Sequence, residues 1–253
     1  MIRFFTTSQD IKTKSIRLST EDSEHIRSLR LRPDELFIVC DGKGADYVCR
    51  LGKHDDCTIA EITEQHQSIG EPSILCRVFI AYSKGERLDY AVQKSVELGA
   101  HEITVFESER CIAVPRDIPK KVARLQRIAL ETAKQSDRGI IPKVTSGGKF
   151  GAVINEAVRA SGLSMLFYES EDNLHIKTLL EQHFSPLRIH EEFEIKSVSI
   201  ITGPEGGFEP NEAELALSKG ISIVSLGPRI LRSETAPVIA LAAVMYHTGN
   251  LER

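Results

Sequence analysis

The stretch V-S-I-I-T-G-P-E-G-G-F, residues 198–208, decides the fold. An apolar run typical of a buried strand, Val198–Thr202, leads directly into a loop with three glycines, and a helical pattern follows at Pro210–Lys219. Glycines let a ligand approach the backbone closely. The loop is neither a G-x-G-x-x-G fingerprint nor a P-loop, so a nucleotide pyrophosphate is poorly supported. A ligand site and a tight strand-to-helix turn explain this first glycine-rich loop, Thr202–Phe208, about equally well.

A second glycine-rich loop, Leu226–Ala236, reads L-G-P-R-I-L-R-S-E-T-A. It also follows a predicted strand, Ile221–Leu226, and leads into a predicted helix, Thr235–Thr248. Charged side chains among apolar ones are costly to bury unless they are paired. We therefore expect Arg232 to pair with Glu234, or either of them to pair with a ligand. The alternative is a solvated loop in which Thr235 caps the helix.

Strands and helices alternate through the rest of residues 71–253, which favours a parallel α/β sheet. In such a sheet, ligands bind beyond the carboxyl ends of the strands. The predicted strands besides the two above are Arg77–Tyr82, Ile103–Phe106 and Leu163–Tyr168. The predicted helices besides the two above are residues 88–98, Ile118–Ser136 and Asn173–His183.

The first 70 residues indicate a different architecture. Short runs of strand character are separated by turn signals, which suggests a small β-barrel. The strands are expected at Ser15–Leu18, Leu36–Cys40, Tyr47–Leu51 and Cys57–Thr63, with one helix at Glu21–Leu31. The polar stretch Gln65–Pro72 is the predicted linker. We therefore expect two domains, residues 1–70 and 71–253.

Composition excludes several classes of protein. The formal net charge is −4, so any contact with nucleic acid must depend on a local basic patch. The five cysteines form no C-x-x-C pair and the histidines show no metal-ligand spacing, which predicts reduced thiols and no metal site. No apolar run approaches the roughly 20 residues of a membrane helix. These features predict a cytoplasmic protein without a membrane segment.

Several strings together resemble one family. The strings G-P-E-G-G-F and L-G-P-R-I-L-R-S-E-T-A are similar to the two cofactor motifs of bacterial 16S ribosomal RNA uridine-N3 methyltransferases of the SPOUT class. The stretch Ala129–Pro142 resembles the central motif of that family. Lys84-Gly85 with Glu97-Leu98-Gly99 resembles the opening of its catalytic domain, and His25–Asp34 with Asp41-Gly42-x-Gly44 its RNA-binding module. The resemblance covers the chain from residue 1 to residue 253.

The resemblance implies a fold and an activity. It implies an N-terminal PUA-like barrel that binds RNA and a C-terminal α/β domain with a deep trefoil knot. It implies S-adenosylmethionine as cofactor, a homodimer, and a single uridine of 16S rRNA in the small ribosomal subunit as target. The predicted cofactor-binding residues come from both loops: Thr202, Gly203, Pro204, Gly206, Gly207, Leu226, Gly227, Ile230, Leu231 and Arg232.

Methylation at uridine N3 must deal with the N3 proton, which uridine keeps at neutral pH. The resemblance places Arg138 near the active site, so Arg138 is the first candidate for stabilising the developing charge and Arg232 the second. Glu205 or Glu234 are the candidate proton acceptors.

RNA contacts are expected from a cluster of basic residues in the N-terminal domain. Arg27 and Arg30 are neighbours on one helical face. The full predicted set is Arg3, Arg17, His25, Arg27, Arg30 and Arg32. A solvated charged face is the alternative.

Two other functions stay open: a SPOUT methyltransferase for tRNA or large-subunit rRNA, and a non-catalytic ribosome-assembly protein.

Overall fold

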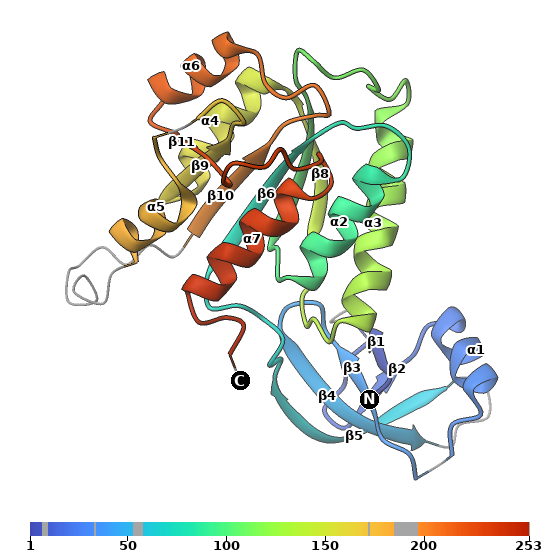
Figure 1. Ribbon diagram of the computed structural model, residues 1–253. Coiled ribbons are helices and arrows are strands. Elements are labelled where there is room, and N and C mark those ends of the chain that lie inside the picture. The colour runs from blue at the N-terminus through green and yellow to red at the C-terminus, as the bar shows by residue number, and fades with distance from the viewer. Residues whose placement is uncertain (7–9, 33, 53–57, 172, 185–196, 253) are drawn as a thin grey trace. The chain divides into compact units, whose positions relative to one another are not determined.

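The computed structural model describes residues 1–6, 10–32, 34–52, 58–171, 173–184 and 197–252 (Figure 1). Contacts between Cα atoms divide the chain into two compact units. The N-terminal unit comprises Met1–Glu71 and Leu130–Ile141, and the C-terminal unit comprises Pro72–Ala129 and Pro142–Arg253. The division after Glu71 lies one residue from the expected boundary. The segment Leu130–Ile141, however, groups with the N-terminal unit.

The C-terminal unit contains a six-stranded sheet in the order β11-β9-β10-β6-β7-β8. Every neighbouring pair is parallel, which confirms the predicted sheet. All its strands therefore have their carboxyl ends at the same edge. The strands are β6 (Leu75–Ala81), β7 (Glu102–Glu107), β8 (Lys143–Lys149), β9 (Leu163–Phe167), β10 (Ser197–Thr202) and β11 (Ser222–Val224).

Helices cover this sheet. Figure 1 shows α2 and α7 side by side in front of it, where both pack on β6. Helix α4 packs on the strands from β7 to β10 and against α6, and it shares a core cluster with Phe79, Phe106 and Ile201. The helices are α2 (Arg87–Glu97), α3 (Ile118–Gln135), α4 (Phe150–Ala160), α5 (Ile176–His183), α6 (Pro210–Ser218) and α7 (Ala236–His247).

The predicted elements of the C-terminal unit are all present, and the structure adds two. Strand β8 has the sequence K-V-T-S-G-G-K, in which only Val144 is buried, so it carries little apolar signal. Helix α4 follows it without a side-chain cap. Helix α6 begins with strong local signals, because Pro210 opens its first turn and Glu209 and Glu212 form a reciprocal capping box.

The N-terminal unit contains a five-stranded sheet in the order β1-β3-β4-β5-β2, in which only β1 and β3 pair in parallel. Four of its strands and its helix were predicted, although Cys57 of the fourth predicted strand lies outside the described residues. The predicted linker was wrong at its start, because β5 continues to Gln67. The elements are β1 (Arg3–Phe5), β2 (Ser15–Arg17), α1 (Thr20–Leu29), β3 (Phe37–Cys40), β4 (Ala45–Gly52) and β5 (Ile59–Gln67).

Within the described ranges, no helix combines the length and the apolar character that crossing a bilayer requires.

Candidate functional site

The first glycine-rich loop is a packed turn at the carboxyl end of β10. Thr202 is fully buried and its hydroxyl donates to the carbonyl oxygen of Phe79 at 3.3 Å. Phe208 is 1% exposed, and the centroid of its ring lies 5.5 Å from the centroid of the Phe150 ring. The Gly207 amide donates to the Pro204 carbonyl at 3.0 Å. The backbone of this loop is therefore fixed by the core.

Two of its glycines have close neighbours where a side chain would stand. A Cβ on Gly206 would lie 3.0 Å from the Cβ of Arg110. Gly207 has a φ of +70°, and a Cβ there would overlap the Glu169 carboxylate. These two glycines can thus be explained by packing within the turn, which agrees with the prediction of a tight strand-to-helix turn.

Arg110, in the loop that follows β7, holds the first glycine-rich loop from outside. Its Nε and Nη2 donate to the Glu209 carboxylate at 2.7 and 2.9 Å, and its Nη1 donates to the Gly206 carbonyl at 3.0 Å. The hydrogen bonds from Arg110 hold the pKa of the Glu209 carboxyl below its usual range. Two loops that follow different strands are thereby joined at one edge of the sheet.

The second glycine-rich loop is far more open. Gly227 has a φ of +100°, and a Cβ there would meet nothing within 4 Å. Ile230 is 88% exposed, while Leu226 and Leu231 are half-buried. The carbonyl oxygen of Arg232 accepts from the amides of Thr235 and Ala236, which starts α7. This loop presents apolar side chains to solvent, as a surface for a ligand would.

Two of the contacts considered for the second glycine-rich loop, the Arg232–Glu234 pair and the Thr235 cap, are not formed. Among the described residues, Arg232 and Glu234 form no ion pair within 4 Å. Glu234 instead lies 3.9 Å from Arg87, and its other neighbour is the Ser233 hydroxyl at 3.3 Å. Thr235 occupies the position before α7, but its side chain makes no capping hydrogen bond.

Arg87, at the start of α2, connects the two glycine-rich loops. Its Nη1 donates to Glu205 Oε1 at 2.9 Å, and its Nε lies 3.9 Å from Glu234 Oε2. Arg87 is not among the residues predicted from the sequence, although it stands three residues after Lys84 and just beyond the carboxyl end of β6. That position was the available signal, because ligand sites in parallel sheets lie at this edge.

The two carboxylate oxygens of Glu205 differ in their hydrogen bonds. Oε1 accepts from the Lys84 amide at 2.8 Å and from Arg87. Oε2 is shielded from solvent and has no hydrogen-bond partner among the described residues. Burial opposes ionisation, but the hydrogen bonds from Lys84 and Arg87 outweigh it and hold the pKa of Glu205 below its usual range. A carboxylate of this kind is a poor proton acceptor and a good partner for a donor on a ligand.

Arg138 belongs to the N-terminal unit, whereas Arg232, Glu205 and Glu234 belong to the C-terminal unit. It is 1% exposed, and its Nε and Nη2 donate to the two oxygens of Glu71 at 2.9 and 2.8 Å. This geometry corrects the expectation that Arg138 stabilises charge on a substrate, because its guanidinium is buried and already bound by a carboxylate.

Arg3 is corrected for the same reason. It is 6% exposed, and two of its nitrogens donate to the Asp46 carboxylate at 2.7 and 2.9 Å. The Cys40 thiol and the Ser68 hydroxyl also donate to Asp46, at 2.7 and 2.6 Å. Burial opposes ionisation of Asp46, but its pKa is lowered by these partners. Arg3 stabilises the interior of its unit and is not available to RNA.

The other predicted RNA-binding residues are exposed. Ser19 caps the start of helix α1, because its hydroxyl accepts from the Asp22 amide, and the last turn of the helix carries Arg27. One ring edge of His25 contacts Phe4 at 5.7 Å between centroids. The exposed residues of the set are Arg17, His25, Arg27, Arg30 and Arg32.

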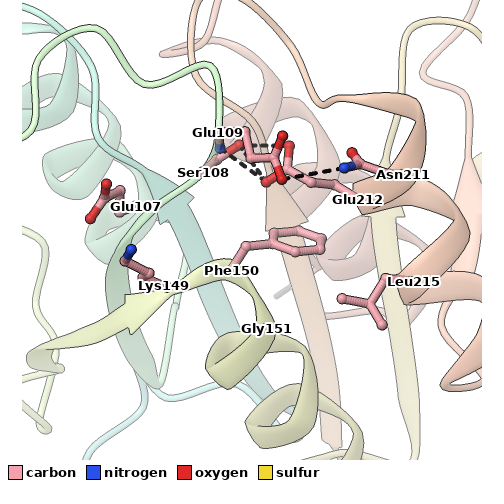
Figure 2. A pocket seen from close by; sticks show the side chains of 9 residues that line it. All are labelled: Glu107, Ser108, Glu109, Lys149, Phe150, Gly151, Asn211, Glu212 and Leu215. Carbon is pink, nitrogen blue, oxygen red and sulfur yellow. Dashed lines mark hydrogen bonds between the residues drawn. The ribbon is translucent and has the colours of Figure 1, made fainter.

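A pocket of about 330 Å³ lies at the carboxyl ends of β7 and β8, and none of the predicted cofactor residues lines it. Figure 2 shows Ser108 and Glu109 converging on the Glu212 carboxylate, with the Phe150 ring nearby. Glu212 is 3% exposed and accepts from the Ser108 hydroxyl and from the amides of Glu109 and Glu209. These bonds fix the start of α6, so the polar wall of the pocket supports the structure.

No cluster of three or more potential metal ligands occurs in the part of the chain that the structure describes.

Comparison with known proteins identifies the class. The profile of the family described as "RNA methyltransferase domain" matches residues 71–245, and that of the "RNA methyltransferase PUA domain" matches residues 18–63. The chain belongs to this family of RNA methyltransferases.

Three relatives indicate the kind of methyltransferase. The chain is 31% identical over 245 residues to the ribosomal RNA small subunit methyltransferase E of Synechocystis sp., covering 96% of this chain and 76% of the relative. It is 29% identical to the Bacillus subtilis protein of the same name, covering 99% and 98%. A crystal structure of the Neisseria gonorrhoeae enzyme, solved with bound S-adenosyl methionine, has a TM-score of 0.78 at 27% identity and covers 97% of both chains.

Proposed function

We propose that this protein transfers a methyl group from S-adenosylmethionine to N3 of one uridine in 16S rRNA of the small ribosomal subunit. The observation that carries the proposal is the pair of glycine-rich loops at the carboxyl edge of the sheet, bridged by Arg87. Relatives named as small-subunit rRNA methyltransferases, one of them solved with this cofactor, support the choice of donor and of RNA.

The residues of the two loops fit this cofactor. Ile230, with Leu226 and Leu231, offers uncovered apolar surface to an adenine ring, and Gly227 leaves open space beside it. The unpartnered Oε2 of Glu205 can accept a hydrogen bond from a ligand donor. The remaining predicted contacts are backbone groups of the first glycine-rich loop and Arg232 of the second. The cofactor, when bound, supplies an activated methyl carbon.

The protein must then orient the uracil and compensate the loss of the N3 proton. Among the candidates, Arg232 is exposed at the open loop and can face the negative charge that develops on the uracil as the proton leaves. Glu205 is less suited to accept the proton, because its pKa is lowered. Glu234 remains the better candidate acceptor, and Arg87 positions it.

The family resemblance further supports a deep trefoil knot, with the two glycine-rich loops at its crossings, and a homodimer. Helix α7 favours a second copy as its covering partner. It carries exposed apolar side chains seven residues apart, Ile239 at 44% and Tyr246 at 73%. Residues at this spacing lie on one face of a helix. A partner copy on this face would lie close to the second glycine-rich loop, which leads directly into α7.

The PUA-like N-terminal unit would contact the RNA through Arg17, His25, Arg27, Arg30 and Arg32. All five are exposed, as phosphate contacts require. A ribosomal substrate would agree with the cytoplasmic location predicted from the sequence.

Methyl transfer with a labelled cofactor tests the proposal. The full chain is incubated with methyl-labelled S-adenosylmethionine and, separately, with 30S subunits, naked 16S rRNA, 23S rRNA and tRNA. Digestion and mass spectrometry then identify the modified nucleoside. We expect N3-methyluridine in 16S rRNA alone. Label in tRNA or in 23S rRNA would contradict the target, and cofactor binding without transfer would favour an assembly role.

A matched pair of variants tests the assignment of charge. Arg232→Gln should lower the single-turnover rate, measured at saturating cofactor, by about 100-fold, the scale of one lost charge-stabilising donor. Arg229→Gln removes an exposed arginine from the same loop and should leave the rate within twofold. Equal rates for the two variants would remove Arg232 from the mechanism.

A further inference from the structure

A basic surface lies on the C-terminal unit, whereas the predicted RNA-binding arginines belong to the N-terminal unit. Between Arg110 and Arg127 the sequence has six basic side chains and one acidic one, although the whole chain has a net charge of −4. These residues form the loop that follows β7 and the first half of α3. We call residues 110–127 the basic segment.

Half of these charges have partners inside the unit. Arg110 is bound by Glu209. Lys121 and Arg124 both reach the carboxylate of Asp89, which is 9% exposed. These three cations hold the segment against the first glycine-rich loop and α2, so the segment has a defined position within its unit.

The other three cations face solvent. Arg116, Lys120 and Arg127 are exposed, and among the described residues none of the three has a carboxylate oxygen within 4 Å. Lys120 and Arg127 are seven residues apart, so they share one face of α3 at a separation of about 10 Å along its axis. Cations that are exposed and not neutralised by ion pairs within the unit suit a polyanionic partner.

Apolar side chains stand among these cations. Ile112 is 65% exposed and Val114 is 37% exposed, and both precede Arg116 in the loop. Such a surface can contact unstacked bases while the cations contact phosphates. The segment also begins at the proposed methyl-transfer site, since Arg110 donates to the carbonyl oxygen of Gly206. An RNA strand bound along it would therefore run toward the first glycine-rich loop.

We propose that the basic segment is a second RNA-binding surface, which holds the backbone of single-stranded RNA next to the target nucleotide. The proposal rests on the proposed function, since it names a further contact for the same substrate. It assigns phosphate contacts to Arg116, Lys120 and Arg127, and base contacts to Ile112 and Val114.

The test compares two triple variants of equal charge change in the full chain. One carries Arg116→Gln, Lys120→Gln and Arg127→Gln. The control carries Arg159→Gln, Lys177→Gln and Lys219→Gln, whose side chains are exposed on or beside α4, α5 and α6. Glutamine keeps helix propensity close to that of lysine and arginine. Affinity for 16S rRNA is measured across a salt series, and cofactor affinity and urea unfolding are measured alongside.

We expect the first variant to bind 16S rRNA at least ten-fold more weakly at low salt. Its plot of log affinity against log salt should be shallower by about 2, since each lost single-strand phosphate contact removes about 0.7 from the slope. The single variant Arg127→Gln should lose about 0.7. The control should stay within twofold, and neither triple variant should change cofactor affinity or unfolding.

An unchanged slope in the first triple variant overturns the proposal, and the segment would then suit an acidic protein surface instead. An equal loss of affinity in the control also overturns it, because the loss would then follow from the change in net charge alone. The proposed function fails separately, if the wild-type protein methylates no RNA. If the wild type methylates 16S rRNA while the first variant binds it normally, only the second RNA-binding surface is refuted.

Discussion

The two glycine-rich loops follow parallel strands of one sheet, but they are built differently. The first is part of the core: Phe208 is 1% exposed and Gly207 has the Glu169 carboxylate where a side chain would stand. The second is open: Ile230 is 88% exposed and Gly227 has free space beside it. Glycine thus serves internal packing in the first loop and access in the second.

This difference suggests that the two loops have different roles in binding a ligand. The first glycine-rich loop is held before any ligand arrives, by Arg87 and Arg110, and offers a preorganised surface. Preorganised groups lose little entropy on binding. The second has apolar side chains that gain contacts only when a ligand covers them. Substitutions in the first should therefore affect folding, and those in the second should affect binding.

The largest expected effect is on folding. Phe208→Ala should lower the free energy of unfolding by about 3–5 kcal/mol, because it empties a fully buried ring site. Ile230→Ala, the matched truncation in the second loop, should change it by less than about 0.5 kcal/mol, because the side chain is exposed. Urea denaturation of both variants measures this contrast. Similar losses in the two would mean that the loops do not differ in packing.

The second effect compares two glycines with positive φ. Gly227→Ala should cost about 1–2 kcal/mol, the usual penalty of the left-handed region for a residue with a Cβ. Gly207→Ala should cost only slightly more, because the exposed end of the flexible Glu169 side chain must also move aside. Urea denaturation again gives the comparison. A larger loss at Gly227 would contradict the contrast in packing.

The third effect is on binding. Ile230→Ala should weaken S-adenosylmethionine binding by about ten-fold, because most of the apolar surface that the cofactor would cover is lost. Calorimetry measures the affinity. Ile112→Ala truncates another exposed isoleucine of the unit, which is 65% exposed, and should leave the cofactor affinity unchanged. If both variants bind as the wild type does, Ile230 has no part in the cofactor site.

The smallest effect concerns Arg87, whose side chain is 42% exposed. Arg87→Gln should cost less than about 1 kcal/mol at pH 7, as exposed ion pairs do. The pKa of Glu205 is lowered in the folded protein from the ordinary 4.5, so this stabilisation is complete above pH 4.5 and is lost as the pH falls through the lowered value. Unfolding curves of wild type and variant should therefore converge in acid. A difference that grows in acid would contradict the bridge.

Local patterns predicted most of the fold but not its weakest elements. β10 and α6 were predictable because an apolar run, a glycine-rich turn and a capping box follow one another. Strand β8 was not, because glycines occupy two of its seven positions. Strand β1, which spans three residues, was not predicted either.

The candidate site was predictable as two loops, but not in its ionic pairs. Arg3 and Asp46 are 43 residues apart, and Arg138 and Glu71 are 67 apart. A buried pair of this kind leaves no local pattern, so both arginines resembled available cations. Arg87 was overlooked because its two carboxylate partners lie on loops that are distant in the sequence. Tertiary contacts alone distinguish a bound arginine from a free one.

Amide hydrogen exchange, with and without S-adenosylmethionine, tests most directly whether the two loops form one methyl-donor site. We predict that the cofactor slows exchange in both loops and that the change is larger across residues 226–236, which are open without it. Unchanged exchange in both loops, or protection confined to the N-terminal unit, would contradict the assignment of the cofactor to this edge of the sheet.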